Sequence, residues 1–349
     1  MKKGLLERLA EGPVVIGEGY IFELERRGYI QAGPFVPRVL VDRPSAVSEL
    51  SHEFLNCGSE VIEALTYYAH REKMRLVGME DCLEQANRNA LRIAKEVAAE
   101  GDALVAGNIC NSNIWITDNK EREAEVRAMF EEQVGWAKEA EVDFIIGETF
   151  DFYGEALLAL NVIKEAGLLA VITLAIHENG LTMDGLSPEE ACKKLEEAGA
   201  DVVGLNCARG PKTMLPLLEK ITKVVSCPVA ALPVPYRTTE KEPCMQSLTE
   251  NGCRCFPTKL DPFVCNRDEI AEFAQEALRM GVRYIGLCCG AGPHHLRALA
   301  VACGKNPPAN RNTADMSKHA HFGTDEKVRK DNRDVLRKAM GIKDDSDHV

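Results

Sequence analysis

Eight short apolar runs, separated by longer stretches with helical patterning, constrain the fold of this chain more than any other feature. Each run is nearly continuous in apolar residues and is bounded by turn residues, which is typical of strands buried on both faces. The runs are VVIGEGY (14–20), VIEALTYY (61–68), ALVAGNIC (103–110), FIIGETF (144–150), LAVITLAI (169–176), VVGLNC (202–207), VAALPV (229–234) and YIGLCC (284–289). Eight strands alternating with helices predict an α/β fold of the (β/α)8 TIM barrel type.

Three of the intervening segments carry clear helix signals. Residues 83–101 repeat apolar side chains every three or four positions and stop at a glycine. Residues 187–200 open with Ser187 as an N-cap, and residues 266–281 open with Asn266. An open doubly wound sheet with an extra domain is the alternative fold, but GEGYIF after the first run lacks the G-x-G-x-x-G spacing of a dinucleotide-binding turn.

The chain divides by composition into a barrel and a tail. We expect residues 1–305 to form the barrel and residues 306–349 to form a polar C-terminal arm that is a candidate for contact with another subunit. Within the arm, EKVRKDNRDVLRKAM (326–340) predicts a short helix. Residues 235–265 are polar, Pro-rich and longer than an ordinary barrel loop, so a lid or substrate-shaping role is expected at the rim where active sites are built.

Charge and cysteine content limit the classes of function. A net charge of −12 over 349 residues argues against nucleic-acid binding, which usually leaves a basic footprint. The N-terminal sequence MKKGLLERLAEG is not a signal peptide because charges interrupt every apolar stretch, and no run approaches the roughly 20 apolar residues of a membrane span. Thirteen cysteines without a signal peptide indicate a reducing compartment, so a cytoplasmic protein is expected.

Three cysteines fall at the ends of two predicted strands, where catalytic groups of barrels lie. Cys207 ends the sixth strand, and Cys288 and Cys289 end the eighth, which is its second neighbour in a barrel. Three thiolates are too few for a closed structural zinc site, but they suit a catalytic site whose fourth position a thiol substrate occupies. The predicted chemistry is metal-activated attack by a substrate sulfur. The alternatives are that the adjacent pair consists of core residues or is a redox-active vicinal pair.

Other strand ends supply candidates for substrate binding. Glu148 follows the apolar FIIG, and a carboxylate in that position needs a cation, for which a substrate ammonium would serve. The first strand ends with Glu18 and Gly19, and the second with Tyr67 and Tyr68.

The remaining cysteines and the paired histidines are given structural interpretations. His294 and His295 are expected to contact solvent or a neighbouring loop rather than a metal. Cys244, Cys253, Cys255 and Cys265 could form a second zinc site, but their C-x₈-C-x-C-x₉-C spacing lacks the tight pairing of structural zinc sites. Six more lie within apolar or helical stretches and are interpreted as structural: Cys57, Cys82, Cys110, Cys192, Cys227 and Cys303.

Together these residues resemble the zinc-dependent homocysteine S-methyltransferases, most closely the betaine–homocysteine branch. The similarity runs from GLLERLAEGPVVIGEGYIFELERRGYIQAGPF through EFLNCGSEVIEALTYYA, EGDALVAG and VDFIIGETF to GLNC and GVRYIGLCCG. The resemblance implies that Cys207, Cys288 and Cys289 bind Zn²⁺ and that homocysteine thiolate is the fourth ligand. It also implies that Glu148 and Tyr68 are catalytic, with Glu148 on the amino group of homocysteine. The implied substrate-binding residues are Glu18, Gly19, Phe35, Thr66, Tyr67 and Asn206.

The sequence departs from the family pattern at several of these positions. The usual Asp-Gly-Gly of the first strand is Glu18-Gly19-Tyr20 here, and Ala64 stands where a threonine is common. Phe35 replaces a tryptophan and Thr149 a tyrosine of the betaine branch, which removes parts of the aromatic cage expected around a quaternary ammonium.

The expected function is therefore methyl transfer from a small onium donor to homocysteine, giving methionine. Betaine, S-methylmethionine and dimethylsulfoniopropionate are the candidate donors, and no cobalamin or folate module is expected because one barrel takes up almost the whole chain. A homo-oligomer is expected. The alternative is a non-enzymatic zinc-binding or thiol redox-sensing barrel, in which Cys288 and Cys289 would oxidise reversibly without methyl transfer.

Overall fold

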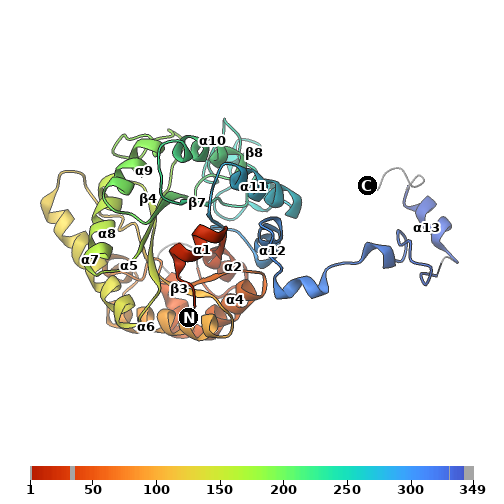
Figure 1. Ribbon diagram of the computed structural model, residues 1–349, viewed down its shortest axis with the longest axis horizontal. Helices are drawn as coiled ribbons and strands as arrows, with labels where there is room; N and C mark the ends of the chain where they lie inside the picture. Colours follow the sequence, from red (N-terminus) through yellow and green to blue (C-terminus); the bar gives the residue numbers. More distant parts are fainter. Residues whose placement is uncertain (1, 32–35, 330, 342–349) are drawn as a thin grey trace. The chain divides into compact units, whose positions relative to one another are not determined.

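The computed structural model describes residues 2–31, 36–329 and 331–341. Within these residues, eight parallel strands close into a barrel in the spatial order β1–β10–β7–β6–β5–β4–β3–β2, and helices surround them (Figure 1). The strands are β1 (Val14–Gly17), β2 (Val61–Glu63), β3 (Leu104–Cys110), β4 (Phe144–Phe150), β5 (Ala170–Leu174), β6 (Val202–Asn206), β7 (Val229–Leu232) and β10 (Tyr284–Leu287). The barrel prediction is confirmed, and the open sheet is excluded because β1 pairs with β10.

The connecting helices begin and end close to where their caps predict. Ser187 accepts a hydrogen bond from the N–H of Glu190, and Asn266 accepts from the N–H groups of Asp268 and Glu269. The helices are α1 (Leu5–Glu11), α2 (Tyr20–Arg26), α3 (Val39–Asp42), α4 (Pro44–Asn56), α5 (Arg71–Leu76), α6 (Leu83–Ala99), α7 (Lys120–Glu139), α8 (Tyr153–Glu165), α9 (Pro188–Glu197), α10 (Pro211–Thr222), α11 (Arg267–Arg279), α12 (Pro293–Ala302) and α13 (Arg333–Ala339). Among the residues described, none of these helices combines the length and apolar character needed to cross a bilayer.

Two segments lie outside the regular alternation of barrel strands and helices. The long loop between β7 and β10 contains a two-stranded antiparallel hairpin, β8 (Thr249–Glu250) and β9 (Cys253–Arg254). The chain forms two compact units, Met1–Pro308 and Ala309–Val349. In the second unit, α13 covers only the later part of the helix predicted over 326–340.

Alternate residues of each strand point into the barrel. These inward residues are apolar near the N-terminal ends of the strands and polar near their C-terminal ends. The inward positions near the N-terminal ends include Val14, Ile16, Phe144, Ile146 and Tyr284, which belong to one buried cluster. Two residues further along each strand the inward positions change character. At the C-terminal end of the barrel they are Glu18, Glu63, Asn108, Glu148, Thr173, Asn206 and Cys288, all buried. The polar layer lies at the end of the barrel where active sites are built.

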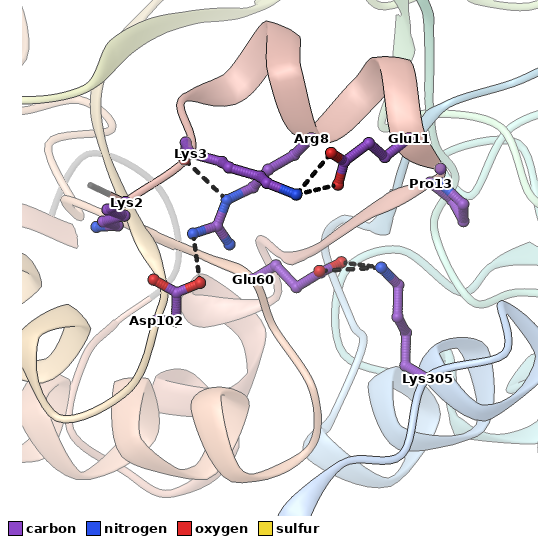
Figure 2. A pocket seen from close by; sticks show the side chains of 9 residues that line it. Lys2, Lys3, Arg8, Glu11, Pro13, Glu60, Asp102 and Lys305 are labelled. Atoms are coloured by element: carbon purple, nitrogen blue, oxygen red, sulfur yellow. Dashed lines mark hydrogen bonds and ion pairs between the residues drawn. The ribbon is translucent and has the colours of Figure 1, made fainter.

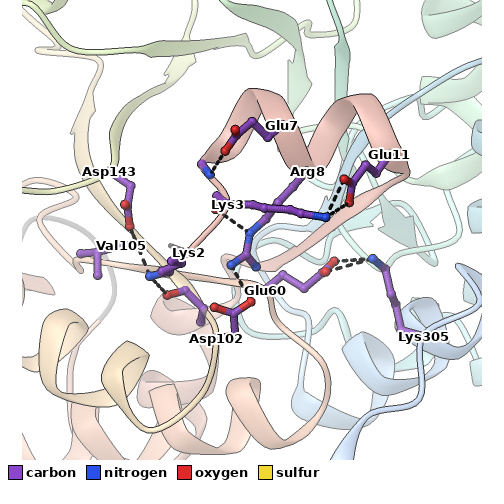
Figure 3. A network of polar contacts seen from close by, with 12 residues as sticks. Lys2, Lys3, Glu7, Arg8, Glu11, Glu60, Asp102, Val105, Asp143 and Lys305 are labelled. Atoms are coloured by element: carbon purple, nitrogen blue, oxygen red, sulfur yellow. Dashed lines mark hydrogen bonds and ion pairs between the residues drawn. The ribbon is translucent and has the colours of Figure 1, made fainter.

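The opposite end of the barrel is closed by α1 and by ion pairs. Leu5 and Leu9 of α1 are buried in the same cluster as the inward residues near the N-terminal ends of the strands. Beside α1, on the side of Arg8 and Glu11, lies a cavity of about 640 Å³ whose wall is charged (Figure 2). Its charges are matched pairwise by Lys3–Glu11 at 2.6 Å, Arg8–Asp102 at 2.9 Å and Lys305–Glu60 at 2.9 Å, with Lys2–Asp143 at 3.6 Å beside them (Figure 3). Polar groups at this end therefore serve stability.

Replacing Leu9 by alanine should lower the free energy of unfolding by about 3 kcal/mol, because a buried leucine leaves a cavity when it is truncated. The side chain is 3% exposed in α1. Urea denaturation measures the effect, and Leu6→Ala on the exposed face of the same helix is the matched control, expected to change stability by no more than about 0.5 kcal/mol. Equal losses in the two variants would show that α1 does not close the barrel.

Candidate active site

Three cysteine sulfurs converge at the C-terminal end of the barrel. Cys207, Cys288 and Cys289 have Sγ atoms within 4.8 Å of one another, and the two sulfurs of the adjacent pair are 3.9 Å apart. The backbone fixes them, since the N–H of Cys207 donates to Leu232 O at 2.9 Å and that of Cys288 to Pro233 O at 3.0 Å. Cys207 itself has a φ of 57°, a conformation that costs a non-glycine residue free energy and is common at functional sites.

The spacing of the sulfurs fits a single metal ion. Two sulfurs bound to one tetrahedral zinc at about 2.3 Å lie about 3.8 Å apart. Hydrogen bonds from Cys288 and Cys289 lower the pKa of the Cys207 thiol, and the same contacts with Cys207 raise the pKa of the other two thiols. The three sulfurs are therefore close enough to share hydrogen bonds, and a soft cation could replace their protons.

A cluster of three glutamates lies directly beside the sulfurs. Glu18, Glu63 and Glu148 are all at least nine-tenths buried. Burial, followed by the negative charge of Glu148, raises the pKa of Glu18 and of Glu63 well above the ordinary range. Burial also raises the pKa of Glu148, to about 7. A cluster of acids in a buried site is compensated when a cation binds there.

Both oxygens of Glu148 are fixed by hydrogen bonds. Asn108 Nδ2 donates to Oε1 at 2.7 Å, and Asn206 Nδ2 donates to Oε2 at 2.8 Å. Asn108 Nδ2 also donates to Glu63, so one amide bridges two carboxyl groups. Asn206 Oδ1 in turn accepts from the N–H of Thr149 at 2.8 Å, where β4 bulges and Thr149 has a φ of 59°. The bulge and the two asparagines together set the direction of the Glu148 carboxylate.

A cavity of about 500 Å³ opens onto this site. Its wall includes Cys207 and Cys289, together with the rings of Tyr67 and Tyr68, which are tilted by 47° to each other with centroids 4.3 Å apart. The loop between β7 and β10 reaches the same cavity, through Met245, Gln246, Phe256 and Pro257. The size and the mixed apolar and polar wall are typical of small-molecule sites.

A Cys–His–Asp contact links the loop to the rim of the barrel. His177 Nε2 donates to Asp151 Oδ1 at 2.7 Å, and this contact, followed by the one with Cys244, raises the pKa of His177 to about 10. Cys244 is buried in the long loop, while Asp151 and His177 follow β4 and β5. The imidazolium therefore holds the loop against two strand ends next to the cavity.

Asp151→Asn should destabilise the protein most below about pH 6.5, the ordinary value for histidine. The pKa of His177 is raised in the folded state, to about 10, so the stabilisation is complete below the unfolded value and is lost as the pH rises through about 10. Between pH 6 and about 10.5, the difference in melting temperature between wild type and Asp151→Asn should shrink as the pH rises. Asp184→Asn, which removes a carboxylate bonded to the N–H groups of Tyr153 and Gly154, should show a gap that does not change with pH.

The structure brings most of the predicted site residues together. Glu18, Glu148 and Cys288 form a second close group, with ligand atoms within 4.8 Å of one another. The hydroxyl of Thr66 donates a hydrogen bond to Asn108 O at 2.6 Å, and Asn206 is fully buried among Glu148, Thr149 and Thr173. Phe35 lies outside the described residues.

Among the described residues, the four loop cysteines form no cluster with metal-ligand spacing, so the alternative of a second zinc site is not supported. His295 contacts the neighbouring loop as expected, through Nε2 and Cys265 O at 3.0 Å. Sequence reasoning missed Glu63 and Asn108, although both occupy inward positions of their strands, and it missed the His177–Asp151 pair, for which the sequence carries no local signal.

The fold and the site define the class of protein: a (β/α)8 barrel with three sulfurs and a buried carboxylate cluster at the catalytic end. Comparison with known proteins makes this more specific. The family model described as homocysteine S-methyltransferase matches residues 17–303. The chain belongs to the homocysteine S-methyltransferase family, as the sequence motifs indicate.

Named relatives cover most of the chain. It is 39% identical over 310 residues to betaine–homocysteine S-methyltransferase 1 of Xenopus tropicalis, a match that covers 86% of this chain and 75% of the relative. It is 36% identical over 335 residues to the S-methylmethionine–homocysteine S-methyltransferase BHMT2 of Pongo abelii, a match that covers 93% of this chain and 87% of the relative. The crystal structure of the homocysteine methyltransferase MmuM from Escherichia coli in its metallated form shares the fold, with a TM-score of 0.66 over 83% of this chain and 96% of that one at 17% identity.

Proposed function

We propose that this protein transfers a methyl group from a small onium compound to the sulfur of homocysteine and so forms methionine. The observation that carries the proposal is the convergence of three cysteine sulfurs at the barrel rim, where Cys207 and Cys289 line a cavity and the buried Glu148 lies close to Cys288. Membership in the family supports homocysteine as the acceptor. Relatives named for betaine and for S-methylmethionine support an onium donor.

We assign Zn²⁺ to Cys207, Cys288 and Cys289. Thiolates are soft ligands that suit zinc, and three protein ligands leave a fourth position for substrate. When bound, zinc would lower the pKa of the substrate thiol, so that sulfur reacts as a thiolate at neutral pH. The spacing of the cysteine sulfurs fits this ion, and a metallated form of the E. coli relative supports a metal in that protein.

The glutamate cluster supplies the acceptor's anchor. The Glu148 carboxylate would bind the ammonium group of homocysteine, and Asn108 and Asn206 would hold both carboxylate oxygens in place for it. The turn of Glu18 and Gly19 is the candidate for binding the carboxylate end of homocysteine.

The donor would bind in the outer part of the cavity, against Tyr67 and Tyr68. Aromatic faces attract a cation, and the loop between β7 and β10 covers the same space. Methyl transfer then forms a sulfur–carbon bond and breaks the carbon bond to the onium atom. The onium atom keeps the electron pair and leaves as a neutral amine or sulfide.

Methionine formation from homocysteine with a panel of donors tests the function. Betaine is the expected donor, with S-methylmethionine and dimethylsulfoniopropionate as the sulfonium alternatives. The reaction is followed by mass spectrometry of methionine, with zinc-loaded protein. If only methylcobalamin or a methyl-folate supports the reaction, the donor assignment is wrong. If no donor does, and Cys288 and Cys289 oxidise reversibly, the redox-sensor alternative is favoured.

Tyr68→Ala should lower kcat/KM for the donor about 2- to 30-fold, the range expected for losing a cation–π contact of about 0.5–2 kcal/mol. Metal content and homocysteine affinity should not change. The Tyr68 ring also contacts a cation of the protein itself, because Lys73 Nζ lies 4.4 Å from its centroid. The matched control is therefore another tyrosine with such a contact: Tyr29→Ala, at an exposed ring whose centroid lies 5.8 Å from the Arg43 guanidinium. An unchanged kcat/KM in Tyr68→Ala would remove this ring from the donor site.

We also propose that the barrel extends to about residue 305 and that the arm beyond it contacts another subunit of a homo-oligomer. Apolar side chains exposed in the arm support this, among them Val335, Leu336 and Met340. A cytoplasmic location agrees with thirteen cysteines that are all free in the described chain. Sedimentation of the full chain and of a chain ending at residue 308 tests the oligomer.

A further inference from the structure

The wall of the active-site cavity contains a cation. Among the described residues of that wall, His177 is the only basic side chain, and Glu25 and Asp151 are the only carboxylates. The other lining groups are apolar, aromatic, amide, hydroxyl or thiol groups. The proposed methyl transfer uses the sulfurs and the tyrosine rings of this cavity, and it leaves His177 without a part in substrate binding.

His177 carries its positive charge at neutral pH. Nε2 donates to Asp151 Oδ1 at 2.7 Å, and this hydrogen bond, followed by the contact with Cys244, raises the pKa of His177 to about 10. Asp151 does not cover the ring, because 38% of the surface of the His177 side chain is exposed. The imidazolium therefore presents a positive charge to the cavity that it lines.

The cation and the aromatic rings come from different parts of the barrel rim. Tyr67 and Tyr68 follow β2, whereas His177 follows β5, which is three strands further round the barrel. Cys207 follows β6, the direct neighbour of β5. One cavity next to a metal-binding sulfur thus combines rings that attract a cation with a cation that attracts an anion. This combination is complementary to a zwitterion.

We propose that His177 binds a carboxylate of the methyl donor, so that the site selects onium carboxylates over onium compounds that lack an acidic group. The inference rests on the proposed function and specifies the class of its donor. The onium end of such a donor contacts Tyr67 and Tyr68, and its carboxylate end contacts the imidazolium. Asp151 holds the ring in place and keeps it charged.

A carboxylate-binding role of His177 differs in its consequences from a purely structural one. Removing the charge should weaken only donors that carry a carboxylate, because the onium end does not contact the imidazolium. If His177 only holds the loop between β7 and β10, its loss should affect all donors equally. The effect of the charge should appear mainly in KM, since the donor carboxylate does not change its charge during methyl transfer.

Betaine and betaine amide test the proposal on the full-length, zinc-loaded protein with homocysteine as the acceptor. The amide keeps the trimethylammonium group and replaces the carboxylate by a neutral group of similar size. The KM of wild type for betaine should lie at least about tenfold below the KM for the amide, as expected for a hydrogen bond between charged groups.

Variants of His177 show whether this residue causes the preference. His177→Gln removes the charge but keeps an N–H for Asp151. It should raise the KM for betaine at least about tenfold, change the KM for the amide by no more than about twofold and leave the zinc content unchanged. His177→Lys keeps a positive charge and should retain the preference for betaine. His52→Gln is the matched control and should change neither KM, because His52 pairs with Glu100 at 3.0 Å outside the cavity wall.

The compound 3,3-dimethylbutanoate separates carboxylate binding from methyl transfer, because a carbon atom replaces the onium nitrogen and no methyl group can leave. Its dissociation constant, measured by ligand-observed nuclear magnetic resonance, should rise at least about tenfold in His177→Gln. Tyr68→Ala should raise it less, since the compound offers no cation to the ring.

Equal KM values of wild type for betaine and its amide would overturn the proposal, whether or not His177→Gln folds. Equal losses for both compounds in a folded His177→Gln would also overturn it and leave His177 as a structural contact of the loop. In either case, methionine formation from betaine would keep the proposed function standing. A protein that binds 3,3-dimethylbutanoate through His177 but methylates homocysteine from no donor would reject the proposed function and retain the carboxylate site.

Discussion

Replacing Cys288 by alanine should remove the bound metal and lower the rate of methionine formation by at least about 10³-fold. Metal activation of a thiol is worth several kcal/mol of barrier, and about 1.4 kcal/mol corresponds to each factor of ten. Wild type should hold about one zinc per chain, as three-thiolate sites do. Cys207→Ala and Cys289→Ala should behave in the same way, because the three sulfurs lie within 4.8 Å of one another.

Metal content by mass spectrometry and methionine formation are measured on the same preparations. Cys253→Ala, at an exposed cysteine of the long loop, is the control and should retain both metal and activity. A triple variant lacking Cys207, Cys288 and Cys289 that still carried a full complement of zinc would show that the metal binds elsewhere.

Two adjacent cysteines can serve one site because the strand ends directly before them. Cys288 follows the last residue of β10 at an inward position, and Cys289 begins the turn that leaves the barrel. Gly290 makes this turn possible: its φ is 93°, and a Cβ there would lie 2.2 Å from the Tyr236 hydroxyl. The chain therefore reverses immediately after the pair and leaves both sulfurs facing Cys207.

The barrel was predictable from sequence because its signals are local and repeated. A strand buried on both faces must be a short apolar run, and all eight runs became barrel strands. Ser187 and Asn266 fixed two helix starts because each satisfies N–H groups that the helix leaves open. The three sulfurs followed from the same logic, since strand ends of a closed barrel meet at one rim.

The rest of the site could not be predicted because it depends on contacts between residues that lie far apart in the sequence. Glu63 is recognised as an inward residue only when the alternation of its strand is counted from Val61, which belongs to the buried cluster inside the barrel. The bridge that Asn108 makes between Glu63 and Glu148 requires the register of three neighbouring strands. The His177–Asp151 pair joins the ends of two strands, and neither residue has a pattern in sequence that indicates the other.

Glu148→Ala should raise the dissociation constant for homocysteine about 30-fold to several thousand-fold, which corresponds to about 2–5 kcal/mol for removing one partner of a buried charge pair. The carboxylate is buried, and both oxygens are oriented by asparagine amides, so little reorganisation is needed when an ammonium binds. Isothermal calorimetry on zinc-loaded protein measures the constant. Zinc content should not change.

An analogue of homocysteine without the amino group separates the ammonium contact from general damage to the site. For 4-mercaptobutanoate, which keeps the thiol and the carboxylate, Glu148→Ala should bind nearly as well as wild type, because the lost interaction involves only the missing ammonium. Glu155→Gln, at a buried acid that binds Ser112 outside the site, should leave both ligands unaffected. Equal weakening for homocysteine and the analogue would mean that Glu148 shapes the pocket. No weakening for either would place the ammonium elsewhere, and Glu63, which shares Asn108 with Glu148, would then be the acid to test.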